Sequence, residues 1–217
     1  MRIFDLSQPL FDGCPNCPVH PPVRLPRVAD HPGDGWRMEE FHMASHTGTH
    51  LDAPLHKLAL GGAIDAFPLE AFVGQAHVIE LKNADSDYAI KGADFAPLYN
   101  IDLHGAIVLL NTGWGHKRAA TEEYLYHSPY LSAEGAQWLV DRGVKGVGID
   151  HFSIGGMSEE NTQTHEILLG AALWVVEDLV FREGWRSAAS AQGALFQALP
   201  LLLPGFSGSP CRAVFVY

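Results

Sequence analysis

The stretch His46-Thr-Gly-Thr-His50-Leu-Asp52-Ala-Pro-Leu-His56 decides how the rest of this 217-residue chain is interpreted. It contains four side chains that bind metals or move protons, separated only by small, β-branched or apolar residues. A glycine, a proline and two threonines within it oppose a helix. The stretch is therefore predicted to form an extended strand or a loop.

A strand would point the even-numbered positions in one direction, so that His46, His50, Asp52 and His56 face one site. Imidazole and carboxylate are preferred ligands of zinc and similar divalent ions. The alternative is chance spacing, because the chain has 12 histidines and single ones serve as surface or core groups. The dense spacing, the glycine that allows close backbone approach and the absence of charged residues in between favour a metal site with one histidine to spare.

The same stretch resembles the H-x-G-T-H-x-D-x-P-x-H signature of the metal-dependent cyclase family, which includes bacterial kynurenine formamidases and isatin hydrolases. The resemblance extends to D-L-S-Q-P-L near the start, L-L-N-T-G-W at 109–114, G-V-G-I-D at 146–150 and the closing strand. It implies a metal-dependent amidohydrolase.

Composition and charge limit the class of protein. Apolar residues make up 47% and charged residues 18%, which is typical of a globular chain, and the length predicts a single domain over residues 1–217. A net charge of −11 argues against nucleic acid or an anionic membrane as partner and favours a small-molecule substrate. No signal-peptide pattern or membrane-spanning run is present, so a cytoplasmic location is expected.

The three cysteines do not predict a disulfide framework, because their number is odd and no leader segment precedes them. Cys14 and Cys17 form a C-P-N-C pair within a proline-rich run, whereas a redox C-x-x-C normally opens a helix after a strand. Redox or structural-zinc use stays open as the alternative. We expect Cys14, Cys17 and Cys211 to be free, the first two in a loop.

The first part of the chain is expected to be irregular. Residues 2–8 alternate as a strand does, and prolines and glycines make 11–34 a long loop of the kind that is usually functional. Residues 37–45 are interpreted as a strand that delivers the motif on a rigid element, with a short helix starting at Glu39 and Glu40 as the alternative.

The rest of the chain alternates strands with a few helices, which predicts an α/β domain with a mixed sheet. The resemblance implies the same class, a swivelling β/β/α fold, and a homodimer or higher homo-oligomer. A single helical turn is expected near residues 68–72. The predicted strands are 75–81, 106–112 with both faces buried, 144–150, 172–179, 197–203 and 211–217, and the predicted helices are 92–98, Ser132 to Gly143 with a cap at each end, and 161–170.

Two residues far from the motif complete the candidate site. Glu177 ends a nearly apolar strand, and a carboxylate there must be solvated, paired or bound to a metal, since burying it bare is costly. The alternative is a surface turn with Asp178. His165 lies near a helix start, twelve residues before Glu177, and this separation matches the formamidases of the family.

The resemblance implies a role for each of these residues. His46 and His50 bind a first metal, His165 binds a second, Asp52 and Glu177 touch both, and His56 accepts and donates protons. Two divalent ions, zinc with manganese as substitute, lower the pKa of water and polarise a carbonyl, while an imidazole transfers the proton. Arylformamidase activity is the leading expectation; an isatin-hydrolase-like or other cyclic-amide hydrolase and a non-catalytic binding module are the alternatives.

Weaker signals concern the substrate. Trp114 either stacks on an aromatic substrate or packs in the core, and His151 follows a strand end, where site residues often lie. Kynurenine formamidases of the family tend to carry a tryptophan in a P-x-W-P setting. This chain has Pro15-Asn16-Cys17-Pro18, so Cys17 is the expected substrate contact and the identity of the substrate is in doubt. The other histidines are interpreted as surface or structural groups: His20, His31, His42, His77, His104, His116 and His127.

Overall fold

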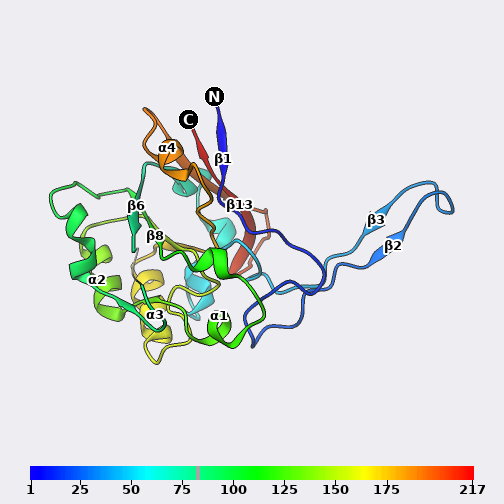
Figure 1. Ribbon diagram of the computed structural model, residues 1–217, viewed down its shortest axis with the longest axis horizontal. Coiled ribbons are helices and arrows are strands. Elements are labelled where there is room, and N and C mark those ends of the chain that lie inside the picture. The colour runs from blue at the N-terminus through cyan, green and yellow to red at the C-terminus, as the bar shows by residue number, and fades with distance from the viewer. Residues whose placement is uncertain (82–83) are drawn as a thin grey trace.

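The computed structural model describes residues 1–81 and 84–217 and is built around one large mixed sheet (Figure 1). The strands from β11 to β6 run parallel, whereas β4 and the strands beyond it pair antiparallel, so β4 and β11 meet at the border of the two halves. The strand order is β5 (Val73–Gly74), β12 (Leu195–Pro200), β13 (Gly208–Val216), β4 (His50–Asp52), β11 (Trp174–Glu177), β10 (Gly146–Ile149), β8 (Ile107–Asn111) and β6 (Ala76–Glu80), with β1 (Ile3–Asp5) beside β13.

Helices are short and few, as the mixed α/β prediction required. The α-helices are α1 (Glu122–Tyr126), α2 (Ala133–Asp141), α3 (Asn161–Gly170) and α4 (Trp185–Ala189), and the 3-10 helices are η1 (Pro54–His56), η2 (Ile64–Ala66), η3 (Leu69–Phe72), η4 (Gly92–Leu98) and η5 (Trp114–Lys117). The predicted caps of α2 are present, because the Ser132 hydroxyl accepts the Gly135 N–H and Gly143 adopts a φ of +69° after the helix. Helices α1 and α4 have only five residues each and were not predicted.

Two apolar cores cover the two faces of the sheet. Along β8, Val108 and Leu110 point toward the core under α2 and α3, and Ile107 and Leu109 point toward the core under α4, β12 and β13. All five residues of β8 are buried, as predicted for this run. Burial on both faces fixes the strand register, and with it the positions of the polar residues at the strand ends.

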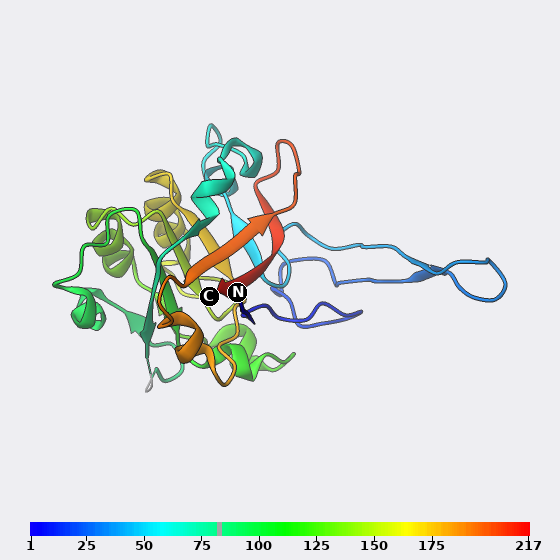
Figure 2. The ribbon, with the colours of Figure 1, turned by 90° about the horizontal axis from the view of Figure 1, so that it is seen from above.

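A long arm, residues 24–42, extends from this body. Strands β2 (Arg27–Ala29) and β3 (Met38–Glu39) pair antiparallel and project away from the sheet in both ribbon views (Figures 1 and 2). The prediction of a strand over 37–45 that delivers the motif is therefore wrong, as is its helical alternative: only Met38 and Glu39 form a strand, and they belong to the arm. The hydrophobic alternation that usually marks a core strand is absent there, and the bonding partner comes from the preceding loop.

A second short sheet joins β7 (Ala89–Ile90) and β9 (Tyr130–Leu131) in parallel. Among the helices within the described ranges, none has the length and apolar character needed to cross a bilayer. The three cysteines are free, as expected.

Candidate metal centre

The register of β4 against β11 brings two parts of the candidate site together. Glu177 lies directly opposite His50, and Asp52 lies opposite Val175. Because side chains alternate along a strand, His50 and Asp52 share one face while Leu51 packs into the apolar core on the other. His50, Asp52 and Glu177 are at most 3% exposed, so the surface-turn alternative for Glu177 is wrong.

Two imidazoles are oriented by backbone carbonyls. His50 Nδ1 lies 2.8 Å from the Gly48 carbonyl oxygen, and His165 Nδ1 lies 2.9 Å from that of Asn161. A carbonyl only accepts, so each Nδ1 carries a proton and each Nε2 faces the site. Burial would lower the pKa of both rings, but Glu177 and Asp52 outweigh it and raise that pKa. Nε2 therefore donates to a carboxylate in the protonated ring and offers a lone pair to a metal in the neutral ring. The Nε2 atoms lie 3.3 Å from opposite carboxylate oxygens of Glu177. Metal-binding histidines commonly donate their other ring N–H to a carbonyl oxygen, as Nδ1 does in both of these rings.

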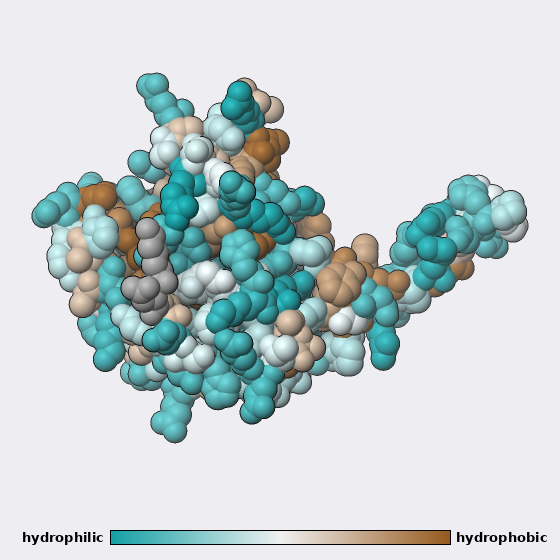
Figure 3. Space-filling view, in the orientation of Figure 1, coloured by the Kyte–Doolittle hydropathy of each residue, from teal (hydrophilic) through white to brown (hydrophobic). Residues whose placement is uncertain are grey.

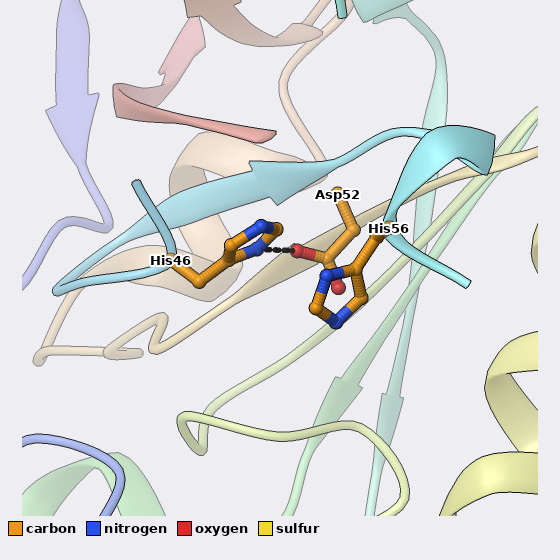
Figure 4. A group of neighbouring side chains, drawn as sticks. All are labelled: His46, Asp52 and His56. Carbon is orange, nitrogen blue, oxygen red and sulfur yellow. Dashed lines mark hydrogen bonds and ion pairs between the residues drawn. The ribbon is translucent and has the colours of Figure 1, made fainter. Parts of the chain in front are cut away.

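His46 reaches the site from the turn before β4. Its Nδ1 lies 2.6 Å from Asp52 Oδ1 (Figure 4). Its Nε2 lies 3.0 Å from the Ser207 hydroxyl. Gly208 of β13 makes room for this ring, because a Cβ built there would overlap His46 Cε1 and the Leu51 carbonyl oxygen. The sequence offered no signal for this requirement, since Gly208 is 162 positions away from His46.

His56 enters from η1, just beyond β4. Its ring centroid lies 4.0 Å from that of His46 and 5.8 Å from that of His165. Burial lowers the pKa of His56 to about 4, with the imidazoles of His46 and His165 adding to the effect. A neutral imidazole at this position can accept a proton.

The motif is thus not one continuous strand. Only His50 and Asp52 of the four candidate residues belong to β4; His46 precedes the strand and His56 lies in the following 3-10 helix. Alternation along one strand would have turned all four the same way, and the side chains converge instead because the turn and η1 bend back toward Asp52 (Figure 4). The predicted group is assembled, by a different local geometry.

Buried charge makes the cluster suited to a cation. Burial would raise the pKa of Asp52, but hydrogen bonds from His46 and His50 outweigh it and hold that pKa well below its usual value. Burial and Asp52 likewise raise the pKa of Glu177, and His165 and His50 lower it further than that. Two ionised carboxylates therefore share a buried site, which is costly without positive charge nearby.

A divalent metal fits the side chains present. Asp52 Oδ2 is buried and has no hydrogen-bond partner among residues 1–81 and 84–217. Two groups of side chains could each hold an ion, because the ligand atoms within each group lie within 4.8 Å of one another. One group is His46, Asp52 and His56, and the other is His50, Asp52 and Glu177. Imidazole nitrogens and carboxylate oxygens in this density form a donor set typical of zinc and manganese proteins. Asp52 belongs to both sets and is placed to connect them.

The cluster opens into a cavity of about 180 Å³. The N-terminal loop supplies one wall with Cys17, Val19 and His20, and Phe152 lies on another side. His20, interpreted from the sequence as a surface or structural group, lies in this cavity wall, and its ring centroid is 6.4 Å from that of His46. The signal that could have located it is the proximity of His20 to Cys17 in the proline-rich run.

Trp114 and His151 lie close to the cavity without lining it. Trp114 is 2% exposed and packs with Tyr124 and Phe152, beneath Cys17. His151 is fully buried, and its two ring nitrogens lie 3.0 Å from the Ser128 hydroxyl and 2.9 Å from the Tyr124 carbonyl oxygen. Burial lowers the pKa of His151 to about 4. Both positions are consistent with packing roles.

Comparison with known proteins identifies the family. Residues 4–155 match the model of a family described as putative cyclase. The chain is 28% identical to a kynurenine formamidase of Bacillus cereus, over 97% of this chain and 95% of that protein, and 32% identical to one of Geobacillus thermodenitrificans, over 80% and 77%.

Solved structures agree with the sequence relatives. Isatin hydrolase A from Labrenzia aggregata, bound to benzyl benzoate, superposes with a TM-score of 0.83 at 26% identity, covering 99% of this chain and 93% of that one. Isatin hydrolase A from Ralstonia solanacearum gives a TM-score of 0.84 at 25% identity, covering 99% and 91%. With the family match over most of its length and the assembled histidine and carboxylate cluster, this chain belongs to the cyclase family of metal-dependent hydrolases.

Proposed function

We propose that this enzyme hydrolyses the amide bond of a small aromatic substrate and that arylformamides of the N-formylkynurenine type are the leading class. The observation that carries the proposal is the approach of His46, His50 and His165 to the two buried carboxylates, Asp52 and Glu177, beside a cavity. The relatives named kynurenine formamidase support the reaction class.

The cluster would hold two divalent ions, zinc with manganese as the substitute. His46 and His50 would hold the first and His165 the second, while Asp52 and Glu177 would contribute to both. When bound, such ions lower the pKa of water toward neutrality and polarise a carbonyl group. The carbonyls of Gly48 and Asn161 hold the His50 and His165 rings in the tautomer that ligation needs.

His56 is the proposed proton carrier. It lies beside His46 at the cavity, and no backbone carbonyl or carboxylate within the described ranges holds its ring nitrogens by a hydrogen bond. In its neutral form it takes a proton from water as the nucleophile attacks, and it returns that proton to the departing nitrogen. An amide requires both transfers because an amine anion is a poor leaving group.

The cavity supports a small and partly aromatic substrate. Phe152 and Cys17 both line the cavity. Cys17 stands in the P-x-x-P setting in which kynurenine formamidases of the family tend to carry a tryptophan. A cyclic amide of the isatin type is the second candidate, favoured by the likeness to the two isatin hydrolase structures. Loss of a stacking ring costs roughly 0.5–1.5 kcal/mol of binding beyond the area buried, which leaves the chemistry unchanged.

We also propose that the enzyme works as a homodimer or higher homo-oligomer formed through the arm. Apolar side chains are exposed on it: Trp36 at 65%, Met38 at 50% and Phe41 at 74%. Brown atoms gather at the base of the arm, where it joins the body (Figure 3). A two-stranded hairpin of this length is marginal in water by itself, so a second copy is its proposed support.

A side-by-side assay tests the substrate proposal. Zinc- and manganese-loaded protein is presented with N-formylkynurenine, isatin and simple cyclic imides, and release of product is followed. The proposal expects N-formylkynurenine to give the highest kcat/KM. A kcat/KM below about 10³ M⁻¹s⁻¹ on N-formylkynurenine, under the usual range of enzymes, together with a higher value on isatin, would transfer the assignment to the cyclic amides.

A further inference from the structure

Arg118 ties the loop that walls the cavity to the body of the protein at several points. Its Nη1 donates to the Pro9 carbonyl oxygen at 2.9 Å, and its Nη2 donates to that of Pro15 at 3.0 Å. Its Nε lies 3.0 Å from Asp178 Oδ2, and both side chains of this ion pair are buried. One guanidinium therefore contacts the loop at two points and the body at a third, in the fixed geometry that arginine provides.

Asp178 is itself held firmly at the end of β11. It follows Glu177 directly, and its backbone adopts a φ of +56°, which non-glycine residues rarely do. The Tyr124 hydroxyl donates to Asp178 Oδ1 at 3.0 Å, and the Thr49 hydroxyl donates to the Asp178 carbonyl oxygen at 2.6 Å. Thr49 adjoins His50, so Asp178 is fixed to both strands that carry the candidate ligands.

The segment that Arg118 holds leads straight into the cavity wall. Beyond Pro15 the chain passes Cys17, Val19 and His20, all of which line the cavity. The His20 N–H donates to the Cys17 carbonyl oxygen at 3.0 Å, so these residues form one turn. This turn lacks strand pairing, and its place relative to Glu177 depends on contacts such as those of Arg118 with Pro15.

We propose that Arg118 is a positioning residue for substrate: by joining Pro9 and Pro15 to Asp178, it holds the wall formed by Cys17, Val19 and His20 against the metal centre and so sets the affinity for substrate. This inference rests on the proposed function, because it takes the cavity as the substrate site. Arg118 does not line the cavity and touches none of the candidate ligands. Its loss therefore affects binding more than the chemical step.

The kinetic test uses Arg118→Gln and Arg118→Lys in the metal-loaded enzyme, with whichever of N-formylkynurenine and isatin the wild type hydrolyses. Arg118→Gln is expected to raise KM at least about fivefold and to change kcat less than about twofold, with metal content unchanged. Arg118→Lys keeps the charge beside Asp178 but not the fork, so its KM falls between those of wild type and Arg118→Gln.

A thiol-labelling test does not depend on any substrate. Cys17 is half-buried in the held turn, whereas Cys14 is buried and burial raises the pKa of the Cys211 thiol far above its usual value. The rate at which a small thiol reagent modifies Cys17, located by peptide mass spectrometry, therefore reports the position of the wall. Arg118→Gln is expected to raise this rate at least about fivefold.

Arg182 is the matched control. It also donates to backbone carbonyls of the N-terminal segment, those of Ser7 at 2.9 Å and Asp5 at 3.4 Å, but it lines a different cavity. Arg182→Gln is expected to leave KM and Cys17 labelling as in the wild type. If it changes both as Arg118→Gln does, the effect is a general loosening of the segment and the proposal fails.

A single variant leaves one charge of a buried pair without its partner, which can prevent folding. The double variant Arg118→Gln, Asp178→Asn removes both charges and keeps a side chain that tolerates positive φ. It is expected to show the raised KM and faster Cys17 labelling. Unchanged labelling in the folded double variant and in Arg118→Lys would overturn the proposal, and faster labelling in an enzyme that hydrolyses neither amide would overturn the proposed function while leaving the anchoring role of Arg118 standing.

Discussion

The arm and the metal centre are neighbours in sequence and opposites in environment. The side chain of Phe41 in the arm is 74% exposed, whereas that of Thr47, only six positions later and next to His46, is 0% exposed. The arm shows apolar side chains to solvent, and the site buries charged ones. Each is an arrangement that costs free energy in an isolated chain.

The difference teaches what each region requires. Asp52 and Glu177 are fixed by strand register and by histidine hydrogen bonds within the chain, and their buried charges favour a bound cation. Strands β2 and β3 have only three and two residues, so the arm has little pairing of its own, and its exposed apolar side chains are the ones proposed to contact a second copy. Substitutions in the site should therefore change metal and catalysis, and substitutions in the arm should change association.

His56→Ala should give the largest effect. Removing the proposed proton carrier is expected to lower kcat by about 10²- to 10⁴-fold, while elemental analysis finds the metal content of the wild type. His42→Ala, which removes an exposed histidine of the arm, is the control and should change neither. An empty site in His56→Ala would make His56 a ligand, in keeping with its place beside His46 and Asp52.

Gly208→Ala should weaken the metal centre from behind. The added methyl group would overlap the His46 ring and the Leu51 carbonyl oxygen, so His46 must move. We expect a loss of metal affinity of about 10- to 100-fold, the range for disturbing the support of a ligand, measured by competition with a chelator. Gly33→Ala in the arm, where nothing lies within 4 Å of the new Cβ, should keep full affinity, and equal losses in both variants would contradict the role of Gly208.

Phe41→Glu should act on association and spare the site. A charge on an exposed ring of the arm is expected to weaken self-association at least about tenfold, measured by analytical ultracentrifugation, with metal content intact. Leu60→Glu alters a fully exposed leucine of the body and should leave association unchanged. A wild-type chain that is monomeric at micromolar concentration would remove the proposed role of the arm.

Trp114→Phe should have the smallest effect. The ring packs beneath Cys17 with Lys117 Nζ 3.6 Å from its centroid, and its indole N–H has no partner within the described residues. We expect a loss of about 1–2 kcal/mol in the free energy of unfolding, measured by urea denaturation, and an unchanged KM. A KM raised with stability intact would show that Trp114 contacts the substrate after all.

Much of the site could be predicted from sequence because its chemistry is local. Four candidate residues lie within eleven positions, and His165 and Glu177 stand out as a polar residue near a helix start and a carboxylate ending an apolar strand. The buried strands β8 and β10 were predictable for a related reason, since their apolar runs have the length of a strand and end in glycine or polar residues.

What could not be predicted depends on contacts across long sequence separations. Gly208 matters only because β13 pairs with β4 behind His46, and Arg118 matters only because η5 ends beside Pro15 and Asp178. His20 reaches the cavity because the N-terminal loop folds back, which no periodicity encodes. The prediction for residues 37–45 was wrong because the strands of the arm pair only with each other, in solvent, and lack the hydrophobic pattern of a core strand.

The proposal that the cluster holds two divalent metal ions is tested most directly by elemental analysis of the wild type and Asp52→Ala, both purified without chelator. The buried Asp52 carboxylate belongs to both candidate ligand sets, and its Oδ2 has no hydrogen-bond partner among the described residues. We predict about two equivalents of zinc or manganese per chain in the wild type and less than about half an equivalent in a folded Asp52→Ala. A wild type with less than about half an equivalent of any transition metal, and none retained after reconstitution, would contradict it.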